Sequence, residues 1–324
     1  MSGRRWARAG GVGAVAVLLL LVPLFITNSY WLHVFIMAGM AVVLACSLRV
    51  IANAGLISMG HGGMMAVGAY TSALLVTKLG FSSWGALLIA GLAAAFLALL
   101  VGFPFMRIKG IYFSLVTVFL AEVVRLTIEQ WRSVTGGTMG LTGIPVPDAI
   151  VIPGVLRADF TSKMQFYYLA LVLVGFSLSL LYALERSRFS KIFAGIEQAD
   201  FLADSVGISS ARFKVLAFCI GCFFAGLVGG FYSQYMSTIT PSTFGFVYSV
   251  YVLIYVVVGG RKRFTGPIIG AIIFTFIPEV ARPLKEYQPF IFAGLLMLTI
   301  FFLREGVVSL PGRVLKLVRG GNHA

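Results

Sequence analysis

Long runs without a charged residue dominate the pattern of this chain, which has 324 residues. A helix that crosses a bilayer needs about 20 apolar residues, and a helix satisfies its own backbone groups inside the hydrocarbon. The pattern therefore predicts an all-α fold, a polytopic bundle of transmembrane helices. The longest runs that lack Asp, Glu, Lys and Arg are Ala9–Leu48, Val50–Thr77, Leu79–Met106, Met164–Leu184 and Val215–Gly260.

We expect about ten helices on this criterion, in a single transmembrane domain over residues 1–324. Arg4, Arg5 and Arg8 precede the first run as in a signal peptide, but no small-residue cleavage site follows, so we interpret this run as a retained helix. Five helices in each half would have opposite orientations, which permits a five-plus-five inverted repeat. The expected helices lie near residues 11–27, 30–51, 64–79, 84–105, 111–130, 166–184, 212–236, 245–259, 266–281 and 288–303.

Composition and charge agree with a membrane protein. Hydrophobic residues make up 59% of the chain and charged residues 11%, against about 25% charged in soluble domains. The net charge of +14 arises from residues at helix ends, which disfavours nucleic-acid binding. Lys and Arg are concentrated in one alternate set of loops, which places both termini in the cytoplasm. The few basic residues of the outer loops are Lys78, Arg132, Arg157, Lys163, Arg282 and Lys285.

Two connections are longer than a simple hairpin needs. The outer loop, residues 131–165, is rich in glycine between Thr135 and Pro145, and it is either a lid or docking surface or a connector. The inner loop, residues 185–212, contains a short amphipathic helix within 194–208, followed by Gly207 as the residue past its end. This helix either is held by a partner protein or lies on the lipid headgroups. Its candidate partner-contacting residues are Glu197, Asp200, Asp204 and Gly207.

No catalytic or metal-binding motif is present in the sequence. An enzyme that acts on lipid therefore has no motif to support it. Cys46, Cys219 and Cys222 lie in apolar runs without a nearby histidine, so we interpret them as packing residues. The pairs Gly226/Gly230 and Gly266/Gly270 have the spacing of close helix contacts.

Two intramembrane features are candidates for function. Glu122 and Arg125 are three residues apart on one helix face, and we favour a structural ion pair near the outer end over a proton relay. The uncharged, glycine-rich segment 54–63 lies between two apolar runs. We favour a broken helix that lines a cavity, where free backbone groups bind polar solutes, over a plain cytoplasmic turn.

Several segments together resemble the LivM-type permeases of branched-chain amino acid ABC transporters. AGLISMGH at 54–61 with VGAY at 67–70 resembles one signature of that family, and GIYF at 110–113 with Thr117 resembles a second. TGGTMGLTGIP at 135–145 resembles its outer loop. FAGL at 224–227 and GG at 259–260 followed by GP at 266–267 fit later segments. The resemblance covers residues 48–310.

The resemblance implies a subunit that is not itself an enzyme. It implies a second permease of the LivH type, two ATPases of the LivG and LivF type that bind ATP and Mg, and an extracytoplasmic solute-binding protein. This chain would bind no cofactor. The implied location is the bacterial plasma (inner) membrane, in contact with lipid. The inner loop would then be the ATPase-coupling segment, with Glu197, Asp200, Asp204 and Gly207 as its candidate residues.

The solute follows less directly from the resemblance. The chain departs from the family pattern at Ala52-Asn53, at Met139 and at 261–263, where Arg-Lys-Arg replaces a less basic turn. Branched-chain or related small amino acids are the first expectation, and urea, short amides or aromatic acids are alternatives. An ion-coupled secondary carrier that uses Glu122 is an alternative of another class. The candidate pathway residues are Ser58, Gly60, His61, Tyr70 and Thr117.

Overall fold

A computed structural model describes residues 17–25, 28–106, 108, 110–152, 156–158, 160–284, 287, 290, 293–294, 297 and 306–307. Residues 17–25 are helical. The long helices are α2 (Ser29–Asn53), α3 (His61–Leu79), α4 (Ser83–Phe105), α5 (Ile111–Gln130), α7 (Lys163–Arg186), α10 (Ser210–Met236), α11 (Phe246–Gly259) and α12 (Thr265–Val280). The short elements are α6 (Arg132–Thr135), η1 (Gly137–Met139), β1 (Leu141–Thr142), β2 (Ile150–Ile152), β3 (Leu156–Ala158), α8 (Arg188–Gln198), α9 (Asp200–Ser205), β4 (Thr238–Ile239), η2 (Pro241–Phe244) and η3 (Arg282–Leu284).

The structure confirms the all-α prediction for the described residues. Their strands are two or three residues long, and six helical segments are long and apolar enough to cross a membrane: Ser29–Asn53, Ser83–Phe105, Ile111–Gln130, Lys163–Arg186, Ser210–Met236 and Pro241–Gly259. The expected helices between 30 and 281 each match an observed helix within a few residues. Of the expected helix 11–27, the described residues 17–25 are helical, whereas most of the expected helix 288–303 lies outside the described residues.

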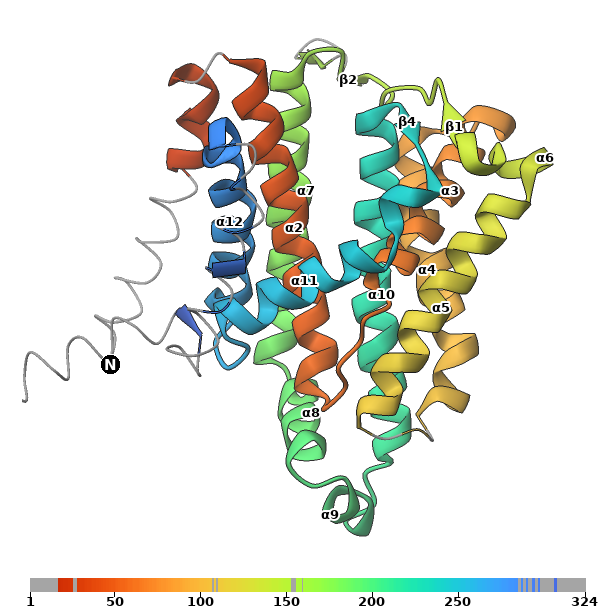
Figure 1. The fold of residues 1–324 in the computed structure, drawn as a ribbon, viewed down its shortest axis with the longest axis vertical. Helices are drawn as coiled ribbons and strands as arrows, with labels where there is room; N and C mark the ends of the chain where they lie inside the picture. The colour runs from red at the N-terminus through yellow and green to blue at the C-terminus, as the bar shows by residue number, and fades with distance from the viewer. Residues whose placement is uncertain are drawn as a thin grey trace, which may run out of the picture.

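Most of the long helices run up and down between two ends of the bundle, and α11 crosses it obliquely (Figure 1). One end carries α8 and α9 and is called here the α9 end; the other carries β1, β2 and α6 and is called the β1 end. The core is centred on α2 and α10, which have the largest buried faces among these helices. The α3–α4 pair packs on α10, while α7, α11 and α12 pack on α2.

Glycines allow the central helices to touch backbone to backbone. A Cβ atom at Gly68 of α3 would overlap the Gly226 carbonyl of α10, and one at Gly229 would overlap the Met65 carbonyl. Of the predicted close-contact glycines, Gly226 therefore lies between two helices: its carbonyl meets Gly68 of α3, and a Cβ atom on it would lie 2.5 Å from Ala94 Cβ of α4. Gly270 of α12 faces the Tyr255 carbonyl of α11. These contacts are within the chain, so the glycines serve intramolecular packing.

Two interruptions break the regular helices. After α2 reaches the α9 end, residues 54–60 return as a non-helical thread into the bundle interior, where α3 begins (Figure 1). After α10 reaches the β1 end, β4 and η2 descend into the bundle, where α11 begins. The segment 54–60 therefore has the geometry of the expected broken helix rather than that of a turn at the end of the bundle.

The two long loops contain more structure than the sequence indicates. In the outer loop, β1 pairs antiparallel with β4, and β2 with β3. In the inner loop, the single helix expected within 194–208 is instead two helices, α8 and α9, separated by Ala199 with φ −158° and ψ 92°. Gly207 follows α9 with a positive φ of 84°, as the sequence predicts.

Candidate functional site

Three helices meet where the two interruptions enter the bundle. The start of α3, the middle of α5 and the start of α11 approach so closely that glycine is required on α3. A Cβ atom at Gly62 would lie 2.8 Å from Ser249 Oγ and 2.9 Å from the Phe244 carbonyl oxygen. A Cβ atom at Gly63 would lie 2.5 Å from the Ala121 Cα. We call this meeting point, formed by residues 58–63, 114–121 and 244–249, the junction.

Hydroxyl groups of α5 hold the non-helical thread in place. Ser114 Oγ donates to the Ile57 carbonyl at 2.7 Å, and the Met59 N–H donates to Thr117 Oγ1 at 3.0 Å. Thr117 is six residues into α5, about 9 Å along its axis at 1.5 Å per residue. Hydrogen bonds to side chains thus replace the helical bonds that the thread lacks, as buried backbone requires.

The structure brings four of the five predicted pathway residues together. Ser58, Gly60, His61 and Thr117 are buried at the junction, and a Cβ atom at Gly60 would lie 3.0 Å from the Thr117 carbonyl oxygen. Tyr70 lies more than two turns further along α3, where its ring packs edge-on against Phe244 at 6.3 Å. The junction is close-packed around these residues, and their place in a solute pathway remains a prediction.

His61 begins α3 and is completely buried. Its Nε2 lies 3.1 Å from Ser47 Oγ of α2, and Ser47 Oγ also donates to the Leu44 carbonyl. The His61 Nδ1 has no hydrogen-bond partner among the described residues. A buried polar atom without a partner lowers the stability of the folded protein. Packing and one hydrogen bond to Ser47 hold His61 in the junction.

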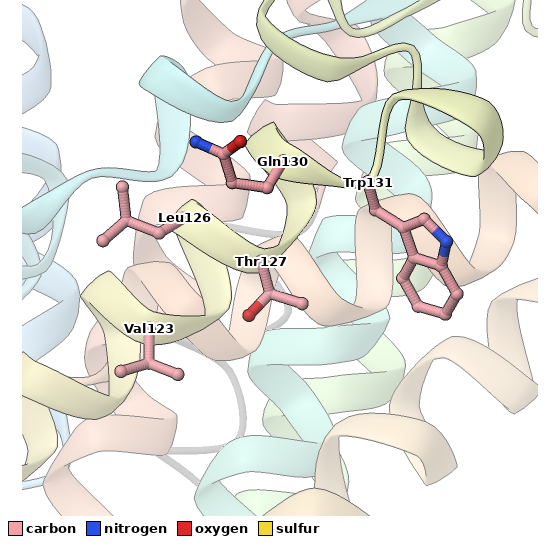
Figure 2. Close-up of a pocket in the computed structure, with 5 residues that line it drawn as sticks. All are labelled: Val123, Leu126, Thr127, Gln130 and Trp131. Carbon is pink, nitrogen blue, oxygen red and sulfur yellow. The ribbon is translucent and has the colours of Figure 1, made fainter.

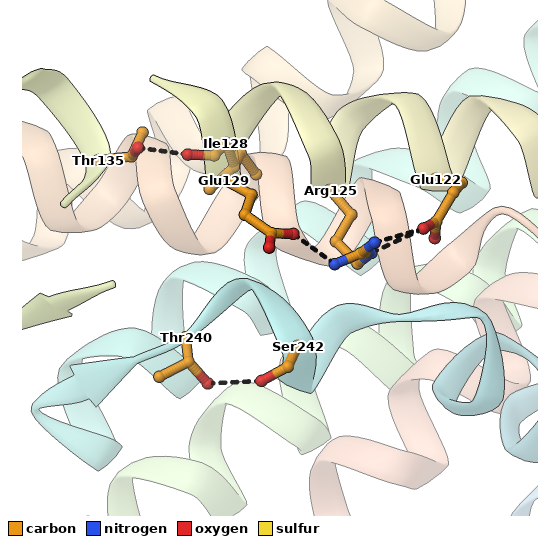
Figure 3. Close-up of polar contacts among 7 residues, drawn as sticks. All are labelled: Glu122, Arg125, Ile128, Glu129, Thr135, Thr240 and Ser242. Atoms are coloured by element: carbon orange, nitrogen blue, oxygen red, sulfur yellow. Dashed lines mark hydrogen bonds and ion pairs between the residues drawn. The ribbon is translucent and has the colours of Figure 1, made fainter. Parts of the chain in front are cut away.

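An ion-pair cluster on α5 lies beside the junction (Figure 3). Arg125 Nε and Nη2 donate to Glu122 Oε1 at 2.9 and 2.5 Å, and Arg125 Nη1 donates to Glu129 Oε2 at 2.6 Å. The pairing of Glu122 with Arg125 is as expected. Glu129 was missed, although its spacing of four residues from Arg125 is the usual signal. Glu122 lies eleven residues into α5, about 16 Å along its axis, nearer the middle than the outer end.

A shallow hollow follows the same helix towards the β1 end (Figure 2). Its volume is about 550 Å³. Most of its lining is apolar, but Thr127 and Gln130 add a hydroxyl and an amide. Its lining residues are Val123, Leu126, Thr127, Gln130 and Trp131.

The acidic residues of the inner loop are bound within the chain. Glu197 of α8 forms an ion pair with Arg261 in the α11–α12 turn, and Asp200 of α9 forms one with Lys214 of α10 at 2.5 Å. Asp204 accepts hydrogen bonds from the N–H and hydroxyl of Ser210. These side chains therefore fix α8 and α9 to the bundle.

The outward surface of α9 is apolar. Phe201, Leu202 and Val206 are 82%, 66% and 74% exposed, and α9 projects beyond the ends of the long helices (Figure 1). We call these three residues the α9 tip. The sequence prediction chose the neighbouring acids as partner-contacting residues and not the α9 tip, although the three apolar residues are interspersed with Asp200, Asp204 and Gly207.

The comparisons with known proteins bear directly on this architecture. A family model described as branched-chain amino acid transport system / permease component matches residues 30–303. The chain belongs to this family. It is similar to the high-affinity branched-chain amino acid transport system permease protein LivM of Escherichia coli K12, with 32% identity over 297 residues, 86% of this chain and 70% of that protein. It is 31% identical to the LivM of Salmonella typhimurium LT2 over 298 residues, with the same shares.

These findings confirm the resemblance to LivM-type permeases. No solved structure matches the chain. The segments that carry the resemblance lie at the contacts described above: AGLISMGH forms the thread and the start of α3, and TGGTMGLTGIP begins at the last residue of α6 and forms η1 and β1. In the GG at 259–260, a Cβ atom at Gly259 would overlap the Gly266 carbonyl. The family motifs are therefore largely sites of close backbone approach.

Metal-binding clusters and thiols are the other features that would give the site chemistry of its own. Among the described residues, no three His, Cys, Asp or Glu side chains are grouped to hold a metal ion. Cys46 and Cys222 are buried and Cys219 is partly buried, and all three are free thiols. As a permease component, the chain is not a catalytic subunit, and the junction, the α5 cluster and the inner loop are its candidate functional features.

Proposed function

We propose that this chain is a membrane permease subunit of a bacterial ABC importer for branched-chain or related small amino acids. The observation that carries the proposal is the family match over residues 30–303, combined with a broken-helix junction inside a bundle of apolar helices. The two LivM relatives are named for branched-chain amino acid transport. The location would be the inner membrane, with the α9 end and both termini in the cytoplasm because the basic loops lie at that end.

The full chain would have ten transmembrane helices related by an inverted repeat. The packing supports this: α3 and α4 pack on α10 in the way that α11 and α12 pack on α2. The two interruptions also occupy equivalent positions in the two halves: one lies between α2 and the shorter α3, and the other between α10 and the shorter α11. Residues 1–324 would thus form one permease domain.

ATP and Mg would be bound by separate ATPase subunits of the LivG and LivF type, with no cofactor on this chain. The ATPases would contact the α8–α9 segment. Because Glu197, Asp200 and Asp204 are already paired within the chain, the α9 tip would supply the contact, and exposed aromatic and aliphatic side chains are what a hydrophobic groove binds. A second, LivH-type permease would lie beside this chain in the membrane.

An extracytoplasmic binding protein would deliver the solute to the outer loop. That loop presents Met139, 81% exposed, on a scaffold held by the β1–β4 pair. The solute would then pass the junction, with Ser58, Gly60, His61, Tyr70 and Thr117 near its path. Rocking of the two halves about the junction would open the path to each side in turn.

The uptake of radiolabelled leucine into vesicles tests this function. The vesicles contain the complete complex, with or without internal ATP, and valine, urea and benzoate compete with the leucine. We expect ATP-dependent uptake that valine blocks. ATP-dependent transport of urea, an amide or benzoate in place of leucine would change the assigned solute but support the assignment as an ABC importer. Proton-driven uptake by this chain alone would overturn the proposal of an ABC importer and show that the chain is an ion-coupled carrier.

A further inference from the structure

The outer surface of α5 differs from the other exposed helix surfaces of the bundle. On α4, the most exposed large side chains are the apolar Leu88, Leu92, Phe96 and Leu100. On α7, Val172, Phe176 and Leu180 are exposed, and the nearby Ser179 hydroxyl is satisfied by the Gly175 carbonyl at 2.7 Å. These two surfaces suit lipid. The α5 surface instead adds two carboxylates and a guanidinium to its apolar side chains.

The charges of α5 are paired but incompletely covered by this chain. The side chains of Glu122, Arg125 and Glu129 keep 39%, 23% and 26% of their exposure. The neighbouring segment that covers them is the start of α11, where a Cβ atom at Gly245 would lie 4.0 Å from Arg125 Cδ. That segment also has an outward surface, with Ser242, Phe246 and Val247 exposed. The α5 surface therefore continues onto α11 across the ion-pair cluster.

Lipid is a poor cover for this surface. Glu122 lies about 16 Å along a helix of 20 residues, which is about 30 Å long and matches the hydrocarbon thickness. An acidic or basic side chain at the centre of a helix in lipid costs about 3 kcal/mol on insertion scales, and such side chains face protein or a polar cavity. The cluster carries two negative charges and one positive charge. A complementary cover therefore brings a cation or hydrogen-bond donors towards the two carboxylates.

We propose that α5 and the start of α11 form the surface that packs against the second permease subunit, which supplies a basic or donor side chain opposite Glu122 and Glu129. This inference rests on the proposed function, because that function provides a second membrane subunit. Leu115, Phe119, Val123 and Leu126, each more than 40% exposed, form the apolar part of the contact. The junction then lies directly behind the interface, so that motion between the subunits reaches the start of α3 through α5.

Site-specific photo-crosslinking in the purified complex tests this surface. A benzophenone amino acid replaces Phe119 or Val123 on α5, or Phe96 on α4 or Phe176 on α7 as matched controls. These four side chains are 66%, 59%, 61% and 59% exposed. We expect a product with the mass of this chain plus the second permease from both α5 positions and none from the controls.

Other products would overturn the inference. A product of two copies of this chain, a product with the second permease only from Phe96 or Phe176, or no protein product from either α5 position would each exclude the α5 surface. Co-purification of the second permease is scored before illumination. If no second permease co-purifies, the proposed function itself fails, which is distinct from a failure of the docking surface.

A pair of substitutions tests the charge argument. In the complex, Glu122→Gln with Glu129→Gln removes both negative charges and should weaken association of the two permeases by at least about tenfold. Glu279→Gln on α12, which removes a carboxylate paired with Arg282 of η3 at 3.3 Å, should leave association unchanged. Equal affinity for the double variant and the unmodified chain would show that the carboxylates take no part in the contact.

Discussion

The N–H of Gly62, at the start of α3, donates a 2.8 Å hydrogen bond to the Oγ of Ser249 in α11. These residues are far apart in the chain and belong to the helices that follow the two interruptions. The bond joins the two halves of the permease at the point where each has broken its helix. Its surroundings leave space for a hydrogen atom at Gly62 and for nothing larger.

Gly62→Ala should therefore damage the protein. Its methyl group would lie 2.8 Å from Ser249 Oγ and 2.9 Å from a carbonyl oxygen, and overpacking of this kind costs about 1–3 kcal/mol. We expect a lower melting temperature of the purified complex and little solute uptake. The control is Gly85→Ala near the start of α4, where a Cβ atom meets nothing within 4 Å. Comparable losses in both variants would show that alanine is harmful for a reason other than the contact.

Arg49 should be a major source of stability at the α9 end. It is 4% exposed, donates to both carboxylate oxygens of Glu185 at 2.8 and 2.9 Å, and donates from Nε to the Arg261 carbonyl at 2.6 Å. Arg49→Met would leave these acceptors without Arg49. Breaking a fully buried pair costs about 3 kcal/mol, and the cost here is smaller because the Glu185 side chain is 27% exposed. Thermal unfolding of Arg49→Met should thus begin well below that of Arg188→Met, which changes an exposed arginine of α8. Equal unfolding temperatures would contradict this ranking.

The α9 tip should govern ATPase binding. Phe201→Asp places a charge on a side chain that is 82% exposed in the isolated chain, so the chain should fold while its affinity for the ATPases falls by more than about tenfold. Ser205→Asp adds the same charge on the same helix outside the tip and serves as the control. Pull-down of the ATPases by each variant gives the comparison. Full ATPase capture by the Phe201 variant would place the contact elsewhere on the inner loop.

The ion pair of Arg261 with Glu197 should affect coupling rather than folding. The pair is partly exposed, and exposed pairs contribute little to stability. It nevertheless links α8 to the α11–α12 turn, and Arg49 donates a hydrogen bond to the Arg261 carbonyl in the same turn. Arg261→Glu should raise the number of ATP molecules hydrolysed for each solute transported. Adding Glu197→Arg restores opposite charges and should recover the ratio. A swapped variant that stays as poor as the single variant would argue against the pair.

Helix positions were predictable from the sequence because each long apolar run has one stable conformation in a bilayer. The same reasoning found the thread at residues 54–60, since uncharged glycine-rich backbone between two apolar runs interrupts a helix. The partner of Gly62 was not predictable, because Ser249 is an ordinary polar residue in an apolar run and its significance is its distant neighbour. Likewise, Ala199 carries no signal that predicts the break between α8 and α9. Glu129 could have been found from its spacing to Arg125.

The length of α11 has a consequence for the surrounding lipid. Its 14 residues extend about 21 Å, which is short of a hydrocarbon layer about 30 Å thick. The rest of that depth is occupied by η2 and the descending backbone before it, and such backbone is not tolerated against acyl chains. Unless another protein covers this place, the bilayer must thin locally and admit headgroups and water to the depth of Thr240 and Ser242. The permease alone would therefore deform its membrane on one side, and assembly of the complex would relieve that mismatch.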